Sequence, residues 1–275
     1  MRALVLGGGG VTGIAWELGV LAGLREHGVD LTDADLIVGT SAGAYVGALV
    51  ATGVDLATAV ADAARIEVEL SPRIDVTLLA QGFAVLTDRS LSPEQARARL
   101  GALACSAPVG EPGEHVARFD QNLPVRRWPT RPRLVVTAVD TSNGKLVAWD
   151  ATAGVPLAEA VAASCAVPGV FPPVPVGGTG HFMDGGVRSV TNADLAAGAD
   201  AVVVLAPTVG VFRASPRQEL ARLAAARTVL LAPDDAARAA IGSNVLDPGR
   251  RGPALAAGTA QAVTLAPEVA RVWRG

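Results

Sequence analysis

The sequence predicts an α/β fold in which a mainly parallel central sheet is flanked by helices. Short aliphatic runs at residues 3–6, 36–40, 134–139 and 201–205 are typical of strands buried on both faces of a parallel sheet. Segments with helical spacing of apolar residues lie between them, and this alternation favours parallel strand–helix–strand units. Half of the 275 residues are hydrophobic and only 18% are charged, so we expect one large domain over residues 1–275.

The first 28 residues predict a strand, a glycine loop and a helix. Four consecutive glycines, residues 7–10, follow the first aliphatic run, and Gly13 comes shortly after them. Apolar residues then recur at helical spacing until Gly28, which suits the end of a helix. Successive backbone N–H groups at the start of such a helix form a site for negative charge.

The spacing of Gly8, Gly10 and Gly13 also matches a dinucleotide-binding fingerprint. That motif needs an acidic residue at the end of the second strand to hold the ribose. Here the nearby acidic residues, Asp30, Asp33 and Asp35, all precede the strand at residues 36–40. The pattern therefore weakens this interpretation, and a non-catalytic nucleotide- or phosphate-binding module stays as an alternative.

The second strand runs directly into Gly39-Thr40-Ser41-Ala42-Gly43, a Gly-x-Ser-x-Gly pattern followed by small residues. This pattern is typical of a sharp strand-to-helix turn with the serine at its apex. The turn exposes the hydroxyl above the end of the sheet, and Gly39 and Gly43 keep side chains away from it. Ser41 is therefore a candidate nucleophile, with an ordinary turn serine as the alternative.

Further along the chain, the pattern changes in the middle of the sequence. Residues 71–132 are rich in Pro, Gly and Arg, and we expect a cap or insertion there, with one helix from Ser92 to about Ala104. Residues 167–174 contain three prolines and predict a rigid apolar loop suited to the wall of an apolar site. Other expected elements are a hairpin strand at 145–149, a last strand at 228–231, and helices at 42–52, 56–70, 156–163, 216–226, 234–241 and 253–270.

A serine hydroxyl needs a base to take its proton. The chain has three histidines, His27, His115 and His181, and nothing in the sequence singles out one of them as a partner for Ser41. A carboxylate, Asp184, stands directly before Gly185 and Gly186. It is a candidate base, although Asp-Gly is also a common turn pair.

Composition excludes several classes of function. The net charge of −3 and the absence of a basic stripe argue against nucleic acid as a partner. Cys105 and Cys165 match no disulfide framework or metal site, so we expect reduced, buried thiols, no metal and no cofactor. The N-terminus has no room for a signal peptide and no apolar run reaches the ~18 residues of a membrane span, which predicts a cytoplasmic protein.

Three motifs in order resemble the patatin-like phospholipase family: the glycine loop at residues 8–13, the serine turn at 39–43, and Asp184-Gly185-Gly186. The block at 163–173 is also similar to the family sequence before the aspartate. The resemblance covers about the first two-thirds of the chain and implies a three-layer α/β sandwich.

The resemblance implies a serine–aspartate dyad without histidine or cofactor, in which Ser41 is the nucleophile and Asp184 the base. The oxyanion hole would come from the loop Gly8, Gly9, Gly10 and Val11, and an acyl-enzyme would form on the serine. The implied substrate is a lipid or another ester, met at a membrane surface; esterase, thioesterase or acyltransferase activity at the same site stays open. The family usually has Arg or Lys where this chain has Thr12, which leaves the headgroup preference open.

Overall fold

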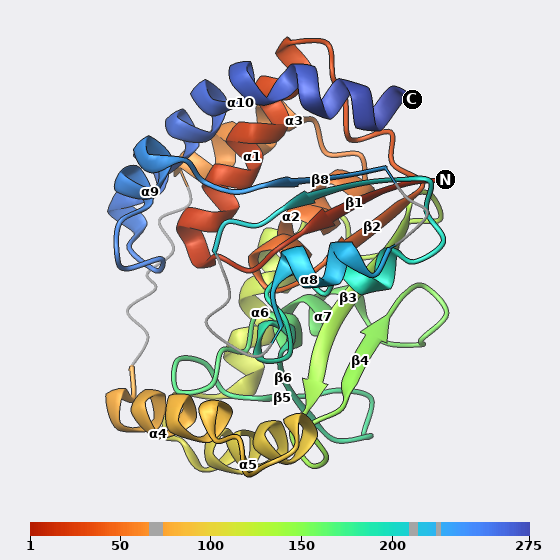
Figure 1. Ribbon diagram of the computed structural model, residues 1–275. Coiled ribbons are helices and arrows are strands. Elements are labelled where there is room, and N and C mark those ends of the chain that lie inside the picture. The colour runs from red at the N-terminus through yellow and green to blue at the C-terminus, as the bar shows by residue number, and fades with distance from the viewer. Residues whose placement is uncertain (66–73, 209–213, 224–226) are drawn as a thin grey trace.

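The computed structural model describes residues 1–65, 74–208, 214–223 and 227–275, and its centre is one mixed sheet (Figure 1). The strand order is β5-β6-β3-β2-β1-β7-β8, with β4 paired to β3. Strands β1, β2, β3, β7 and β8 are parallel, and the pairs β3–β4, β3–β6 and β5–β6 are antiparallel. The strands are β1 Arg2–Leu6, β2 Leu36–Gly39, β3 Arg133–Asp140, β4 Leu146–Trp149, β5 Val174–Pro175, β6 His181–Asp184, β7 Ala201–Leu205 and β8 Arg227–Leu231.

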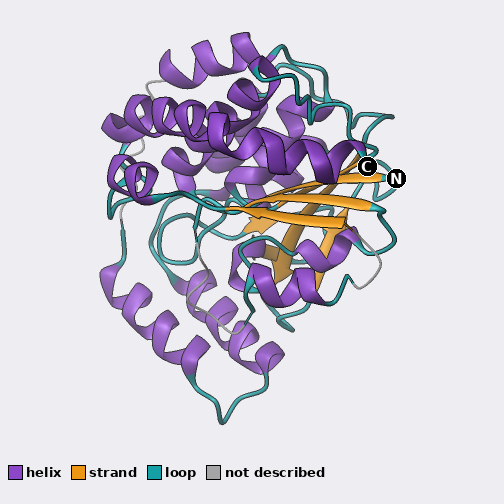
Figure 2. Ribbon diagram, turned by 45° about the horizontal axis from the view of Figure 1, so that its top comes forward, coloured by secondary structure: helices purple, strands orange, loops and turns teal. Residues whose placement is uncertain are grey.

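Helices cover both faces of this sheet, so the predicted α/β architecture with a mainly parallel sheet is confirmed (Figure 2). The described α-helices are α1 Gly10–Glu26, α2 Ala42–Ala51, α3 Leu56–Arg65, α4 Val76–Thr87, α5 Pro93–Ser106, α6 Pro112–Asn122, α7 Leu157–Ser164, α8 Pro216–Ala221, α9 Asp235–Ile241 and α10 Arg251–Arg274. Short 3-10 helices are η1 Gly185–Val187, η2 Ala193–Ala196 and η3 Pro248–Arg250.

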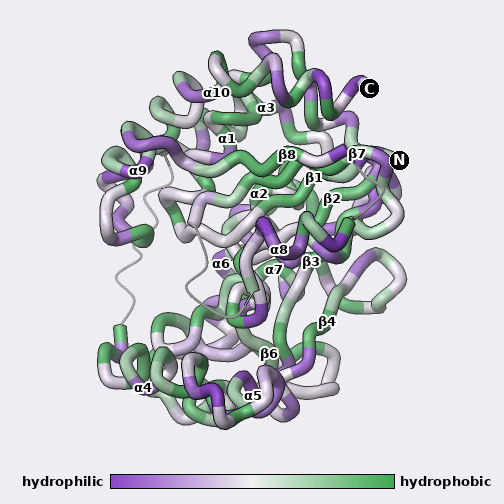
Figure 3. Tube along the Cα trace, in the orientation of Figure 1, coloured by the Kyte–Doolittle hydropathy of each residue, from purple (hydrophilic) through white to green (hydrophobic). Residues whose placement is uncertain are grey.

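The central strands are apolar because they supply two cores at once. Successive side chains of a strand point to opposite faces. In β1, Leu4 and Leu6 pack into the larger core with helices α1, α2 and α10, whereas Ala3 and Val5 pack with η2 on the other face. Figure 3 shows these strands as hydrophobic along their length, and this is why the sequence contains uninterrupted aliphatic runs.

Within the predicted insertion at 71–132, the described residues 74–132 contain three helices where the sequence predicted one. The predicted helix from Ser92 is α5, with a capping box between Ser92 and Gln95. Helices α4 and α6 were not predicted. Helices α4 and α5 lie side by side at one end of the molecule (Figure 1), where Leu78, Leu86 and Leu100 pack with Met183 of the sheet.

Two further expectations need adjustment. The predicted helix at 56–70 begins at Leu56, and its residues 66–70 lie outside the described part of the chain. The predicted helix at 216–226 begins at Pro216 but already ends at Ala221, and residues 224–226 lie outside the described part. Cys105 was expected to be buried but is exposed. It follows Ala104 on α5 and does not belong to the buried face of that helix.

No helix among the described residues is long and apolar enough to cross a membrane.

Candidate active site

Ser41 lies at the apex of a strained turn between β2 and α2. Its backbone angles are φ 54° and ψ −121°, in the half of conformational space that residues with a side chain rarely adopt. The N–H of Ser41 donates a hydrogen bond of 2.9 Å to the buried Oγ of Ser164 in α7, which helps hold the turn in this form. The residue is 8% exposed. The structure therefore forms the sharp turn that the sequence predicts.

The two glycines of the turn are required by close approach of the backbone. A methyl group on Gly43 would lie 2.1 Å from the carbonyl oxygen of Leu6, and one on Gly39 would lie 2.6 Å from Cα of Ala44. The N–H of Gly43 also donates to the carbonyl of Gly7 at 2.9 Å. Helix α2 thus presses directly on the end of β1, and this brings the glycine loop next to the serine.

The glycine loop touches Ser41 through Gly8. A methyl group on Gly8 would lie 3.4 Å from Cβ of Ser41 and 3.9 Å from its Oγ. The N–H of Gly8 itself donates to the carbonyl of Val190 at 2.8 Å, so this donor is already used. The N–H groups of Gly9, Gly10 and Val11 have no acceptor among the described residues. Gly10 and Val11 line the same cavity as Ser41, so the start of α1 presents there backbone donors of the kind that bind negative charge.

Thr12 is fully buried and ties the loop to the segment before α10. Its N–H and its hydroxyl donate to the carbonyl of Val245 at 3.1 Å and 3.2 Å. The position where the family usually has a cation is therefore filled by a small side chain that faces protein. Two arginines, Arg118 and Arg251, line the cavity beside Ser41 instead.

A buried acid, Glu17, lies beneath the glycine loop and was not predicted as part of the site. Its Oε1 accepts a hydrogen bond of 2.9 Å from the N–H of Gly7, and its Oε2 has no partner among the described residues. Burial raises the pKa of Glu17 well above its usual range, because no countercharge among the described residues compensates the desolvation of its carboxylate. The signal in the sequence was a lone charge inside the apolar stretch from Ile14 to Leu24.

The sheet register brings Asp184 to the serine. In β3, Val136 pairs with Gly39 of β2, and Ala138, two residues later, pairs with Asp184 at the end of β6. The Ser41 hydroxyl lies close enough to the Asp184 carboxylate to act on its pKa, and Oδ1 of Asp184 accepts a hydrogen bond from the N–H of Gly186 at 2.6 Å. The two motifs predicted to form the site therefore meet.

Asp184 is buried, and its environment changes its acidity. Burial is the main cause that raises the pKa of this carboxyl to about 7, against the smaller, lowering effects of the hydrogen bonds from Ser41 and Gly186. Cys165 lies beside the same pair, and burial raises the pKa of its thiol, which stays protonated at neutral pH. A carboxylate with a pKa near 7 exchanges its proton under ordinary conditions.

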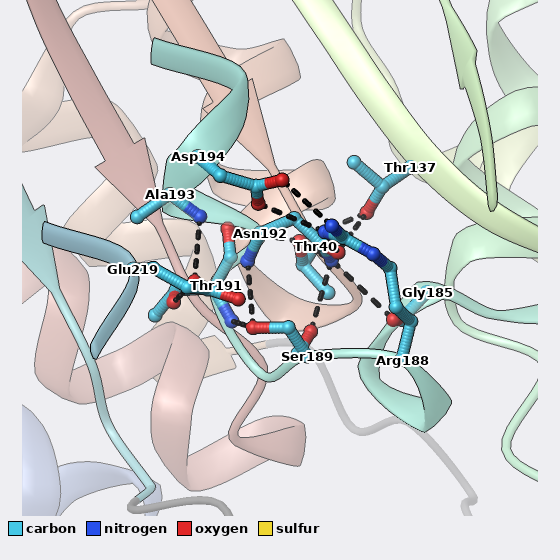
Figure 4. Close-up of polar contacts among 10 residues, drawn as sticks. All are labelled: Thr40, Thr137, Gly185, Arg188, Ser189, Thr191, Asn192, Ala193, Asp194 and Glu219. Carbon is cyan, nitrogen blue, oxygen red and sulfur yellow. Dashed lines mark hydrogen bonds and ion pairs between the residues drawn. The ribbon is translucent and has the colours of Figure 1, made fainter. Parts of the chain in front are cut away.

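A buried hydrogen-bond network fixes the two ends of this site to each other (Figure 4). The side-chain amide of Asn192 donates to Thr40 Oγ1 at 3.0 Å, to the carbonyl of Gly185 at 3.3 Å and to that of Ser189 at 2.9 Å. Thr40 precedes Ser41, and Gly185 follows Asp184. Asn192 therefore connects the side chain of the residue before the candidate nucleophile with the backbone of the residue after the candidate base.

The same network continues to charged groups around Asn192. Asn192 Oδ1 accepts a hydrogen bond from Arg188 Nη1 at 2.7 Å, and Arg188 also forms an ion pair with Asp194 at 2.6 Å. Glu219 accepts from Thr191 Oγ1 and from the N–H of Ala193, both at 2.8 Å. No sequence pattern indicated these residues, since only the folded sheet brings them together.

None of the three histidines forms a triad with this pair among the described residues. His27 and His181 are exposed. His115 is buried, its Nε2 lies 3.0 Å from the carbonyl of Ala162, and its ring stacks on Phe171 with centroids 4.6 Å apart. Burial lowers the pKa of His115 to about 4, so this ring is a neutral part of the wall at pH 7.

A cavity of about 560 Å³ opens beside Ser41. Its walls are mainly apolar and come from α1, α2, α6 and the loop at 167–173, which the sequence predicted as an apolar wall. Lining residues include Ile14, Leu18, Tyr45, Phe119, Val167 and Phe171. Among the described residues, no group of three or more His, Cys, Asp or Glu side chains is arranged to hold a metal ion.

A serine on a strained strand–helix turn, beside free backbone donors and a buried carboxylate, defines an α/β protein of the serine nucleophile-elbow class. The chain belongs to the patatin-like phospholipase family: the sequence profile of that family, described as "Patatin-like phospholipase", matches residues 4–197. This stretch contains all three motifs of the site, and membership supports lipid hydrolase activity.

Three individual proteins resemble parts or all of the chain. A stretch of 53 residues is 51% identical to "Lysophospholipase NTE1" of Eremothecium gossypii, and covers 19% of this chain and 3% of that protein. VipD from Legionella pneumophila has 14% identity and a TM-score of 0.49 over 97% of this chain and 66% of its own. ExoU, crystallised with SpcU from Pseudomonas aeruginosa, has 16% identity and a TM-score of 0.44 over 100% of this chain and 53% of its own. The chain thus spans only part of each of these proteins.

Proposed function

We propose that this chain is a serine lipid acyl hydrolase in which Ser41 is the nucleophile and Asp184 the general base. One observation carries the proposal: the Ser41 hydroxyl lies beside a buried carboxylate, that of Asp184, whose pKa is raised to about 7. A base with a pKa near the working pH combines a useful ionised fraction with a useful affinity for the proton. Family membership adds the expectation of a lipid ester as substrate.

In this mechanism Ser41 Oγ attacks the ester carbonyl carbon while its proton moves to Asp184. The resulting oxyanion accepts hydrogen bonds from the N–H groups of Gly9, Gly10 and Val11, each worth roughly 3–4 kcal/mol in comparable sites. The carbon–oxygen bond to the alcohol then breaks, and the alcohol leaves with the proton from Asp184. Water next attacks the acyl-serine with Asp184 as base and releases the carboxylic acid.

The cavity suggests how the substrate lies. Its apolar walls suit an acyl chain, with the ester next to Ser41 and the loop donors. Arg118 and Arg251 line the same cavity and would meet an anionic group on the alcohol side of the ester. This arrangement gives the chain a source of positive charge although position 12 is a threonine.

Hydrolysis of p-nitrophenyl butyrate by the purified protein tests the proposal. We expect turnover that Ser41→Ala lowers by about a thousandfold or more, because the nucleophile is lost. Ser106→Ala is the matched control, since Ser106 is an exposed serine at the end of α5, and should keep full activity. Equal turnover by Ser41→Ala would contradict the assignment. A thermal shift with a nucleotide, in a protein that hydrolyses no ester, would favour the phosphate-binding alternative.

A further inference from the structure

Helix α4 presents an apolar face that no described part of the protein covers. Leu78, Gly82 and Leu86 form its buried stripe. Val76, Leu79 and Phe83 lie on another face, at spacings of three and four, and are 71%, 39% and 54% exposed. Ile74, just before the helix, is 44% exposed.

The helix also lacks the charged residues that an exposed face normally carries. Its twelve residues, VTLLAQGFAVLT, include no Asp, Glu, Lys or Arg. Figure 3 shows mainly hydrophobic residues along α4, at the edge of the molecule, away from the main body of helices. In water such a face is unfavourable, and exposed apolar patches of this kind mark contact surfaces.

The face is continuous with the wall of the substrate cavity. The N–H of Asp75, the N-cap residue of α4, donates to the carbonyl of Gly169 at 2.8 Å. Leu78 and Leu79 pack closely on Gly169, since a methyl group there would lie 3.0 Å and 3.5 Å from their Cδ2 atoms. Gly169 stands between Val167 and Phe171, which line the cavity. A partner bound to the exposed face of α4 would therefore lie next to the loop at 167–173, which lines the cavity.

We propose that the α4 face, Ile74, Val76, Leu79 and Phe83, is the surface by which this protein docks onto a lipid membrane. The inference deepens the proposed function, and rests on it for the idea that the substrate is a membrane lipid. An uncharged helix that lies in the interface buries its apolar side chains among the acyl chains and binds without electrostatic attraction. Asp75 and Asp88 flank the helix, and the described residues next to it carry no excess of positive charge, so zwitterionic lipid is sufficient.

A second copy of the chain suits this face less well. Twelve residues of helix extend over about 18 Å, and with a width of about 10 Å the face offers far less than the ~800 Å² per partner of a stable interface. A membrane needs no such matched area, since each inserted side chain contributes by itself.

Sedimentation with vesicles of phosphatidylcholine tests the proposal directly, in the Ser41→Ala background so that binding is read without turnover. We expect the Ser41→Ala protein, the parent of the other variants, to sediment with the vesicles. Phe83→Asp and Val76→Asp should each lower the partition coefficient about tenfold or more, because a charge replaces an apolar side chain that inserts into the membrane. Val263→Asp is the matched control, because Val263 is a 51% exposed residue of α10. This substitution should change the partition coefficient by less than about twofold. Melting temperatures verify that all variants are folded.

Two outcomes would overturn the docking surface: a parent that stays in the supernatant, or α4 variants that sediment like Val263→Asp. A parent that is dimeric without lipid, and monomeric after Phe83→Asp, would assign the face to self-association instead. The same substitutions in the protein with Ser41 should leave hydrolysis of dissolved p-nitrophenyl butyrate unchanged and slow hydrolysis of vesicle lipid. Loss of all hydrolysis together with normal vesicle binding would contradict the proposed function and leave the docking surface standing.

Discussion

The hydroxyl of Ser41 lies beside the carboxylate of Asp184, although the strands that lead to them, β2 and β6, are separated in the sheet by β3. The contact exists because β3 is long enough to pair with both neighbours, with β2 through Val136 and with β6 through Ala138. Both residues lie where their strands end. The sheet thus positions a hydroxyl and a carboxylate from distant motifs.

The first prediction concerns the pH dependence of the rate. The base must be ionised to accept the proton of Ser41, and burial raises the pKa of Asp184 to about 7. For a neutral ester, kcat/KM should therefore rise with pH, about tenfold per unit below 7, and level off above it. A pH profile of p-nitrophenyl butyrate hydrolysis measures this. A rate that is flat between pH 5 and 8 would contradict the role of this carboxyl.

The second prediction concerns stability. The pKa of Asp184 is higher in the folded state, about 7, than its ordinary value of 3.8, so the folded state holds the proton more tightly. The contribution of Asp184 to the free energy of unfolding is therefore greatest below its ordinary pKa, and it decreases as the pH rises towards 7. Asp184→Asn stays neutral, and should be more stable than wild type by about 4 kcal/mol at pH 8 but by only about 2 kcal/mol at pH 5.

Urea denaturation of both proteins at the two pH values measures this difference. Because the substituted protein should also lose activity, its gain in stability would show that the ionised carboxylate is kept for function at the expense of stability. An Asn variant that is less stable than wild type at pH 8 would contradict the account of Asp184 as a destabilised, ionisable acid.

The third prediction concerns the network around Asn192. Asn192→Ala removes the bonds to Thr40, Gly185 and Ser189 and leaves buried groups unpaired, so it should cost about 2–4 kcal/mol. It should also lower kcat more than it changes KM, since Ser41 and Asp184 lose their common support. Asn143→Ala is the control: Asn143 is exposed in a turn, and its loss should cost less than about 1 kcal/mol.

The fourth prediction compares two glycines. Gly43→Ala places a methyl group 2.1 Å from the carbonyl oxygen of Leu6, and should destabilise the protein by about 3 kcal/mol or more and remove activity. Gly113, in the first turn of α6, has no positive φ, and a methyl group added to it would meet no described atom within 4 Å. Gly113→Ala should stabilise the protein by about 0.5–1 kcal/mol without change in activity. Thermal unfolding of both variants distinguishes these outcomes.

Much of this organisation could be predicted from local patterns. The strand at 201–205 and the turn around Ser41 depend on short-range features, namely an aliphatic run and two glycines, and both are present as predicted. The glycine loop and the carboxylate before Gly185 could be found for the same reason, since each is a compact motif.

Other features have no local signal. Helix α4 is apolar on several sides and shows no clear helical periodicity, whereas α6 has few apolar residues and buries little more than His115. Asn192 belongs to no motif in the sequence, and its role comes from contacts with strands far away in the chain. The order of motifs also could not show that the N–H of Gly8 donates to the carbonyl of Val190, whereas the N–H groups of Gly9, Gly10 and Val11 have no acceptor among the described residues.

The central claim is that Asp184 activates Ser41, and the rate of labelling by a fluorophosphonate measures this most directly. At pH 8 we predict a single adduct on the peptide that contains Ser41, identified by mass spectrometry, and a rate at least about a hundredfold lower in Asp184→Asn. Labelling of a different residue, or equal rates in the wild type and a folded Asp184→Asn variant, would contradict the claim.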